Sequence, residues 1–349
     1  MLSTSNSDLA TRWTRLRGEQ PMLRIRDAAV TLGVSEAELV ALGVGRTATP
    51  LAANWRSILD EMPTVGRIMC LTRNDNCVHE RHGRFEDVQV SGPHGLVLGP
   101  DIDLRLFLSN WRYAFAVREP LRQGERLSLQ FFDVSGEAVL KIYATDETDR
   151  PAFDALIARH SAEAPPAMAI VPPKPDLADL PDAEIDLDGL RAAWRAMKDT
   201  HEFFGMLGKF KVGRVQALRL VGEDLARELP ARALRSALEA ASADGTPIMI
   251  FVGNRGCIQI HTGPVKRLVE TQGWFNVLDP AFNLHLRDQA VARVFSVRKP
   301  TDDGIVTSIE AFDDRDRNIL LMFGERKPGN PELEQWRALV ARIEKQAAS

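Results

Sequence analysis

The segment from residue 186 to residue 218 carries the side chains most able to do chemistry. Its apolar positions recur at intervals of four, three, four and three residues, which predicts one helical stripe containing a single histidine: Leu190, Trp194, Met197, His201 and Phe204. An imidazole on the core face of a helix needs a hydrogen-bond partner or a metal ion. The histidine is therefore either a core residue with satisfied hydrogen bonds or a ligand.

The neighbours of this histidine favour a ligand. Phe203 and Phe204 supply flat apolar surface, and the basic residues Lys209, Lys211 and Arg214 follow within a few turns. An axial nitrogen, aromatic walls and basic groups that pair with carboxylates are what a haem site requires. The sequence has no Cys-x-x-Cys-His motif, so a haem here is expected to be held non-covalently.

Two histidines near Cys77 form a second candidate group. His79 and His82 are three residues apart in a predicted strand, so they point to opposite faces. Cys77 and His79 share a face, but two ligands do not complete a zinc site. We interpret the segment as a polar strand edge with one buried cysteine. The alternative is a weak secondary haem contact at His79 or His82.

Two further motifs have ordinary structural explanations. Residues 253–256 read Gly-Asn-Arg-Gly without a following Gly-Lys-Ser or Gly-Lys-Thr, which predicts a hairpin turn and not a phosphate-binding loop. Residues 27–39 are similar to a helix-turn-helix fragment, but they carry no basic recognition face. Ordinary helix packing is the interpretation we adopt, and a DNA-binding regulator is a remote alternative.

The composition limits the class of protein. The 349 residues include 44 Lys and Arg against 48 Asp and Glu, and the formal net charge of −4 argues against a general electrostatic grip on nucleic acid or anionic lipid. No apolar run approaches the ~20 residues of a membrane helix, and the N-terminus shows no apolar leader segment. Three cysteines are too few for a disulfide framework. These features predict a cytoplasmic protein that is not embedded in a membrane.

The chain contains an internal duplication. Residues 68–140 align with residues 248–320 without a gap at an offset of 180, and 19 positions are identical. An ungapped repeat of this length indicates two halves of one design. Six prolines within residues 161–182 favour an extended spacer between the halves. We therefore predict a first repeat over 1–160, a proline-rich linker over 161–182 and a second repeat over 183–349.

The local patterns predict the same order of elements in each half. Residues 7–60 are expected to be helical, with a capping box that begins at Ser35, and short alternating runs separated by turns follow from residue 65. Each half closes with a helix, after Pro151 or Pro331. Consecutive strands with short turns form antiparallel sheets. The predicted fold class is α+β, as two similar halves, each with a large antiparallel β-sheet covered by helices.

The chain resembles the HemS/HmuS family of bacterial cytoplasmic haem-binding proteins, also called hemin-degrading factors. The resemblance covers nearly the full length, including the duplication and the linker. Its most specific segments are LTRNDNCVHERHGRFEDV (71–88), DLRLFLSNWRYAFAV (103–117), THEFFGMLGKFKVGRVQAL (200–218), GNRGCIQIHTGPVKRL (253–268) and VFSVRKPTDDGIVTSIEAFD (294–313).

The resemblance implies a set of site residues. The axial histidine of such proteins lies at the start of a helix in the second half, which here is His201. An arginine from the first half faces the distal side of the haem, here Arg105, with Phe107 on the same strand face. The haem propionates are implied to meet three basic residues, Arg214, Lys299 and Arg326.

The two halves differ at these positions. At the offset of 180, His201 corresponds to Pro21, and Lys299 corresponds to Glu119. Only the second half therefore carries an axial candidate. This asymmetry predicts one main site per chain for haem b, built with residues of both halves.

Two functions of different class follow from the resemblance. The first is a haem carrier that receives imported haem from an inner-membrane importer and passes it to a haem oxygenase or another acceptor for iron release. The alternative is an enzyme that itself opens the porphyrin oxidatively and releases iron. The expected partners are haem and these proteins, with no nucleic acid.

Overall fold

The computed structural model describes residues 6–121, 124–162, 168–172, 179–326 and 329–347. Of the linker predicted over 161–182, residues 163–167 and 173–178 lie outside the described residues. The chain divides into two compact units. The first comprises Met1–Thr72, Arg81–Lys174 and Asn254–Ile258, and the second comprises Arg73–Glu80, Pro175–Gly253 and Gln259–Ser349. Each unit therefore includes a short piece of the other half of the sequence.

The first half opens with the predicted helices. These are α1 (Asn6–Glu19), α2 (Ile25–Leu32), α3 (Glu36–Ala41) and α4 (Trp55–Glu61), and α5 (Arg150–His160) closes the half. The capping box is confirmed, because Ser35 Oγ accepts from the Glu38 backbone N–H while the Glu38 carboxylate accepts from the Ser35 backbone N–H. The first-half strands are β1 (Ala48–Pro50), β2 (Gly66–Arg73), β3 (Cys77–Gly83), β4 (Asp87–Ser91), β5 (His94–Leu98), β6 (Asp103–Phe107), β7 (Trp111–Pro120), β8 (Glu125–Asp133) and β9 (Ala138–Thr148).

The second half repeats this order. Its helices are α6 (Leu187–Arg195), α7 (Glu202–Phe210), α8 (Arg214–Leu220), α9 (Ala233–Asp244) and α10 (Glu334–Ala347). Its strands are β10 (Ala226–Leu229), β11 (Ile248–Gly253), β12 (Cys257–Gly263), β13 (Leu268–Thr271), β14 (Trp274–Asp279), β15 (Phe282–Leu286), β16 (Arg293–Thr301), β17 (Gly304–Phe312) and β18 (Asn318–Gly324). No helix within the described residues is long and apolar enough to cross a membrane.

The strands form two nine-stranded sheets, which confirms the duplicated α+β fold. Their orders are β1-β7-β8-β9-β2-β3-β15-β14-β13 and β10-β16-β17-β18-β11-β12-β6-β5-β4. Each sheet takes six strands from one half of the sequence and three from the other. The interpretation of residues 77–83 as a polar strand edge is wrong, because β3 lies between β2 and β15. Pairing on both sides satisfies the backbone groups that an edge strand leaves open.

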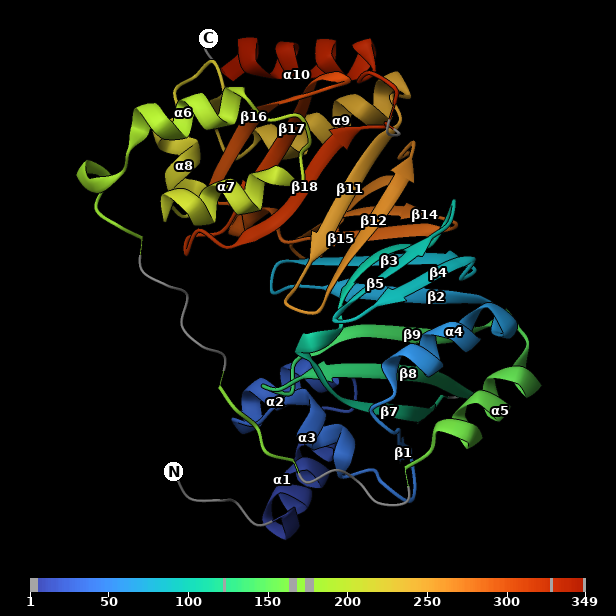
Figure 1. Ribbon diagram of the computed structural model, residues 1–349. Coiled ribbons are helices and arrows are strands. Elements are labelled where there is room, and N and C mark those ends of the chain that lie inside the picture. The colour runs from blue at the N-terminus through green and yellow to red at the C-terminus, as the bar shows by residue number, and fades with distance from the viewer. Residues whose placement is uncertain (1–5, 122–123, 163–167, 173–178, 327–328, 348–349) are drawn as a thin grey trace. The chain divides into compact units, whose positions relative to one another are not determined.

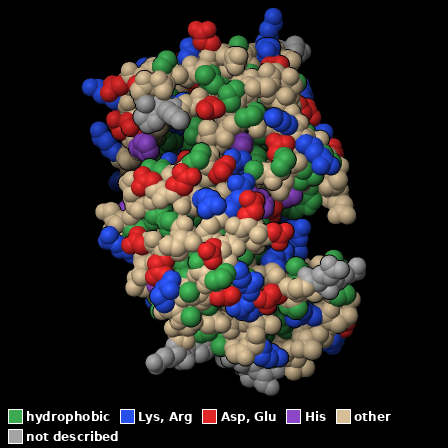
Figure 2. Space-filling view, turned by 90° about the vertical axis from the view of Figure 1, so that its right-hand side faces the viewer, with side chains coloured by type: hydrophobic (Ala, Val, Ile, Leu, Met, Phe, Trp, Pro, Cys, Tyr) green, Lys and Arg blue, Asp and Glu red, His purple; other side chains and the backbone are tan. Residues whose placement is uncertain are grey.

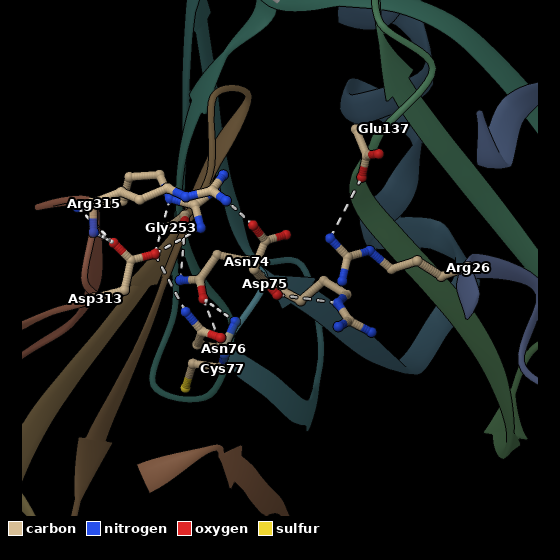
Figure 3. Close-up of polar contacts among 11 residues, drawn as sticks. Arg26, Asn74, Asp75, Asn76, Cys77, Glu137, Gly253, Asp313 and Arg315 are labelled. Carbon is tan, nitrogen blue, oxygen red and sulfur yellow. Dashed lines mark hydrogen bonds and ion pairs between the residues drawn. The ribbon is translucent and has the colours of Figure 1, made fainter. Parts of the chain in front are cut away.

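Two equivalent hairpin turns, near Asn74 and Asn254, each lie in the unit formed mainly by the other half of the sequence. Within the second unit, the Asn74 side-chain amide donates to the carbonyls of Gly253 and Ile319, at 3.3 and 2.8 Å. Figure 3 shows Asn74 beside Gly253. Within the first unit, Asn254 donates to the carbonyl of Val139 at 2.9 Å. The turn predicted at 253–256 is confirmed between β11 and β12. The buried Cys77 consequently belongs to the core of the second unit.

Strand alternation divides the second unit into two helix-covered faces. Phe295 and Val297 on β16 pack in one core with residues of α6, α7 and α8, which Figure 1 shows beside β16 and β17. Ser296 and Arg298, the intervening residues, instead donate to Glu344 on α10. Lys299 therefore belongs to the face covered by α6, α7 and α8. On the face drawn in Figure 2, acidic and basic side chains are interspersed.

Candidate functional site

His201 lies at the junction of two helices, at the N-cap position of α7. The prediction of one continuous stripe is wrong, because α6 ends at Arg195 and the chain turns before α7 begins. Leu190, Trp194 and Met197 are buried as expected, but the His201 side chain is 89% exposed and Phe204 is 67% exposed. The interruption breaks the helical phase, so the imidazole points to the surface and is accessible to a ligand.

Asp199 fixes the orientation of the exposed imidazole. Its Oδ1 accepts the His201 backbone N–H at 2.8 Å and lies 2.6 Å from Nδ1 of the ring. The hydrogen bond from the backbone of His201 holds the pKa of Asp199 below its usual value, so this carboxyl is ionised at neutral pH. With Nδ1 turned to the carboxylate, Nε2 is the ring nitrogen that could bind a metal ion. This is the usual arrangement of a histidine that binds a metal.

The side chains of Glu310, Lys299 and Arg214 form a largely buried group next to Phe203 of α7. Glu310 on β17 is fully buried, and its Oε1 accepts from Lys299 Nζ at 2.6 Å. Its Oε2 accepts from Nε and Nη2 of Arg214, at 2.9 and 2.8 Å. Ser308 donates to Oε1 at 2.9 Å. We call these four residues the Glu310 cluster.

The Glu310 cluster contacts the aromatic residues that follow His201. Lys299 Nζ lies 4.4 Å from the centroid of the Phe203 ring, and the Arg214 guanidinium lies 5.1 and 5.4 Å from the centroids of Phe203 and Phe204. Cations at these distances from a ring are stabilised by its electron-rich face. The structure thus brings Arg214 and Lys299 together at the phenylalanines that follow His201 by two and three positions.

Burial and mutual attraction set the protonation of the Glu310 cluster. Burial alone would raise the pKa of Glu310, but Arg214 and Lys299 outweigh it and lower this pKa to about 2. Burial lowers the pKa of Lys299 to about 8, with Arg214 adding to this effect and Glu310 opposing it. At neutral pH the cluster therefore contains two cations and one carboxylate.

Arg326 lies in the same unit, after β18. Its guanidinium is 3.6 Å from Asp303, and its charge contributes to the lowered pKa of Asp199. This places Arg326 within electrostatic reach of the Asp199–His201 pair. Four of the six predicted site residues thus belong to the second unit: His201, Arg214, Lys299 and Arg326.

Arg105 and Phe107 lie in the first unit, on β6. The predicted alternation is confirmed there, because Leu104 and Leu106 are buried in the core while Arg105 and Phe107 are half-buried. The Arg105 guanidinium forms an ion pair with Asp103. Both residues of the first half therefore point away from the core of their own unit.

The second histidine group does not form a metal site. His79 is fully buried and packs against Phe282, with ring centroids 5.0 Å apart, and His261 stacks on the same ring at 3.7 Å. Among the residues that the structure describes, no group of three or more His, Cys, Asp or Glu side chains is arranged to hold a metal ion.

A polar hollow of about 400 Å³ opens near the Asn74 turn, away from these residues. Arg317 in its wall is paired with Asp75 and Asp313, both at 2.7 Å, and Figure 3 shows Asp313 beside Asn76. Three aspartates and two arginines line the hollow, so its formal charge is negative and does not favour an anionic ligand.

Two residues that matter to the site were not predicted from the sequence. Asp199 precedes His201 by two residues, and an Asp-x-His spacing is a local signal that a search for the orienting partner of a ligand would have found. Glu310 lies in an alternating strand, 96 residues from Arg214. Its role depends on a long-range contact that no local pattern contains.

Comparisons with known proteins identify the family of the chain. A family model described as the haemin-degrading HemS.ChuX domain matches residues 33–160 and 211–343. The hemin transport protein HmuS of Yersinia pestis is 40% identical over 342 residues, covering 97% of this chain and 98% of that protein. The hemin transport protein HemS of Yersinia enterocolitica is 40% identical over 334 residues, covering 95% of this chain and 96% of that protein.

Solved structures show the same fold over nearly the whole chain. Holo-PhuS, a heme-binding protein from Pseudomonas aeruginosa, matches with a TM-score of 0.94 and 48% identity, covering 96% of this chain and 98% of that one. ChuS, a heme degrading enzyme of Escherichia coli O157:H7, matches with a TM-score of 0.91 and 40% identity, covering 97% and 99%. The family model spans more than half of the chain, and relatives align with nearly all of it. The chain therefore belongs to the haemin-degrading HemS/ChuX family.

Proposed function

We propose that this protein binds one haem b non-covalently and delivers it for iron release, as a cytoplasmic haem carrier. The observation that carries the proposal is an exposed imidazole whose Nδ1 is held by Asp199, in a segment whose two following phenylalanines contact a cluster with net positive charge. Membership of the family and the names of its relatives support the same ligand. An inner-membrane haem importer and a haem oxygenase or other acceptor are the proposed partners.

Each residue has a defined part in this proposal. His201 Nε2 is the axial ligand, Asp199 holds the tautomer, and the exposed Phe204 packs against the macrocycle, while the buried Phe203 contacts the Glu310 cluster. Arg214, Lys299 and Arg326 form the basic side that meets the propionates. Haem itself supplies any redox chemistry when bound, while the protein residues control its position and its access to water.

The alternative function is oxidative opening of the porphyrin by this protein. ChuS, 40% identical, is described as a heme degrading enzyme, whereas the relatives HmuS and HemS are described as transport proteins. The same site serves either function, because both need an axial histidine and basic contacts to the propionates.

The test begins with an absorption titration of the purified protein with hemin. We expect a Soret band that saturates near one equivalent. Reductant is then added to the holo-protein in the presence of catalase. Slow bleaching that catalase suppresses supports a carrier, whereas an identified tetrapyrrole product with released iron supports the enzyme. A titration without a saturable Soret change would refute haem binding itself.

Asp199→Asn is expected to weaken the bond between His201 and iron. The neutral amide accepts a weaker hydrogen bond from the Nδ1–H group than the carboxylate does, so Nε2 becomes a weaker ligand for the metal. Loss of such a partner typically costs about 10–100-fold in metal affinity. We expect a lower iron–histidine stretching frequency in the Raman spectrum of the ferrous protein. Asp303→Asn, which alters a carboxylate near Arg326 instead, is the control. An unchanged frequency would show that Asp199 only caps the turn.

Arg105→Ala tests the contribution of the first half. A guanidinium on the distal side favours anionic iron ligands, because it donates hydrogen bonds and carries positive charge. We expect the fold to remain intact, cyanide and azide affinities to fall, and the pH at which the ferric spectrum changes to shift. Arg81→Ala, which removes another arginine paired with an aspartate, at 2.6 Å, is the control. If Arg105→Ala, Arg81→Ala and the parent bound cyanide and azide with equal affinity, Arg105 would not be a residue of the haem site.

A further inference from the structure

The two halves place different side chains at one equivalent position of their sheets. Glu310 on β17 lies opposite Phe295, and Gln130 on β8 lies opposite Phe115, in the same register of the repeat. Each also contacts an equivalent serine, since Gln130 Nε2 lies 3.0 Å from Ser128 Oγ as Glu310 Oε1 lies 2.9 Å from Ser308 Oγ. The strand therefore accepts a neutral amide here, and the fold does not require the carboxylate.

The charged groups near Gln130 in the first half differ from those near Glu310 in the second half. The helix over this face begins at Glu36 in the first half and at Arg214 in the second, both at the same distance in sequence from the paired residues Ala48 and Ala226. Glu36 forms a buried ion pair with Lys141, one anion with one cation. The first half thus has a balanced pair where the Glu310 cluster has one uncompensated positive charge.

Burial distinguishes the two cations of the cluster. The Lys299 side chain is 4% exposed and lies under the Phe203 ring, whereas the Arg214 side chain is 16% exposed and reaches both phenylalanines. Glu310 engages Nε and Nη2 of Arg214. Among the residues that the structure describes, Nη1 of the guanidinium has no hydrogen bond or ion pair, so it can take a ligand. Arg214 is therefore the accessible cation, and Lys299 is the charge behind it.

We infer that Glu310 is a positioning residue, which neutralises Lys299 and aims Arg214 so that the cluster receives a single carboxylate group of the ligand. The inference rests on the proposed function, in which the ligand is haem and the carboxylate is one propionate. The charged groups that face Lys299 are Glu310 on β17 and Arg214 on α8, and Phe203 on α7 covers its remaining side. A preorganised guanidinium binds carboxylate at lower entropic cost than a free one.

The first experiment uses the haem-free protein. The titration of Lys299 is followed by NMR of its ¹³Cε resonance in the parent, in Glu310→Gln and in Glu344→Gln. Glu344 is the matched control, because it is a buried carboxylate paired with a serine and Arg298 on the opposite face of β16. We expect Glu310→Gln to lower the midpoint by about one pH unit or more, since an attractive charge is lost, and Glu344→Gln to leave it unchanged.

The second experiment asks whether the effect depends on the carboxylates of the ligand. Release of hemin and of hemin dimethyl ester to apomyoglobin is timed for the same variants. We expect Glu310→Gln and Arg214→Ala to release hemin about tenfold faster, with a much smaller effect on the diester, and Glu344→Gln to change neither rate. Equal acceleration of hemin and diester, or slower release of hemin from Glu310→Gln, would overturn the inference while the proposed function stood.

Two further measurements keep the inference testable. If Glu310→Gln does not fold, Lys299→Met/Glu310→Gln removes the buried pair together and leaves the Arg214 charge, with the same ester-dependent acceleration expected. If the parent protein binds no hemin, the proposed function fails. Sodium propionate then replaces hemin, and the absence of a shift in the Arg214 Nε–Hε resonance refutes the carboxylate site as well.

Discussion

Replacing His201 with alanine is expected to change the ferric and ferrous absorption spectra of the haem complex. The substitution removes an exposed imidazole two residues before Phe203, whose ring contacts Lys299 of the Glu310 cluster. Loss of an outer partner of a metal ligand costs about 10–100-fold in affinity, so loss of the ligand itself is expected to cost at least as much. The ring packing and the basic contacts remain, so spectra are more diagnostic than affinity.

His82→Ala is the control for this experiment. His82 lies on β3, is half-buried and was the alternative haem contact, whereas His79 on the same strand is fully buried. We expect His82→Ala to retain the parent spectra. If His201→Ala kept the parent ferric and ferrous spectra while His82→Ala lost them, the assignment of the axial ligand would be wrong.

The double substitution Arg214→Ala/Lys299→Ala is expected to have two large effects. Haem release to apomyoglobin should accelerate, because the charge-assisted hydrogen bond from Arg214 to a propionate contributes roughly 1.5–3 kcal/mol when desolvated, and the positive charge of Lys299 behind it is lost as well. The free energy of unfolding at neutral pH should also fall by about 3–5 kcal/mol, because Glu310 is left as a buried carboxylate without a cation.

The pH dependence of the free energy of unfolding tests whether the lost stability comes from the charge of Glu310. In the parent protein the depressed pKa of Glu310 contributes stability that is present above about pH 4.5 and is lost as the pH falls toward 2. In the double variant the carboxyl is buried without partners and its pKa rises, so the variant should approach the parent in stability as the pH is lowered. Urea unfolding at several pH values measures this.

The triple variant with Glu310→Gln is the control for the double substitution. It removes the buried charge, so most of the lost stability should return, while haem release stays fast because the cations are still absent. Parent-like haem release from the double variant would mean that Arg214 and Lys299 serve the fold alone. Equal instability of the double and triple variants would contradict the role given to the charge of Glu310.

Local patterns were sufficient for the elements and for the repeat. The capping box at Ser35, the alternation of Leu104 with Arg105 and the turn at 253–256 each depend on residues a few positions apart, and each is confirmed. Predictions that depended on longer stretches of sequence were less accurate. The stripe through His201 was wrong because a helix end after Arg195 changed the phase, and apolar spacing alone does not mark such an end.

The composition of the two compact units also depends on contacts between residues far apart in the sequence. A cut at the predicted boundary of 183–349 omits residues 73–80, which belong to the second unit. Asn74 and Cys77 in this segment provide hydrogen bonds and core contacts there. An internal repeat reveals that two similar halves exist. It does not reveal whether a hairpin packs against its own half or against the other half, because the repeated sequence is the same in both cases.

The sequence by itself determined the fold class, through periodicity and repetition, and the family, through the resemblance of its motifs, and it named His201 as a candidate ligand. Only the tertiary structure decided that His201 is exposed and held by Asp199, and that Arg214 and Lys299 share one buried carboxylate. These features depend on burial and on distances between residues far apart in the chain. Burial and distance set the strength of a charge–charge interaction, and they exist only after the chain has folded.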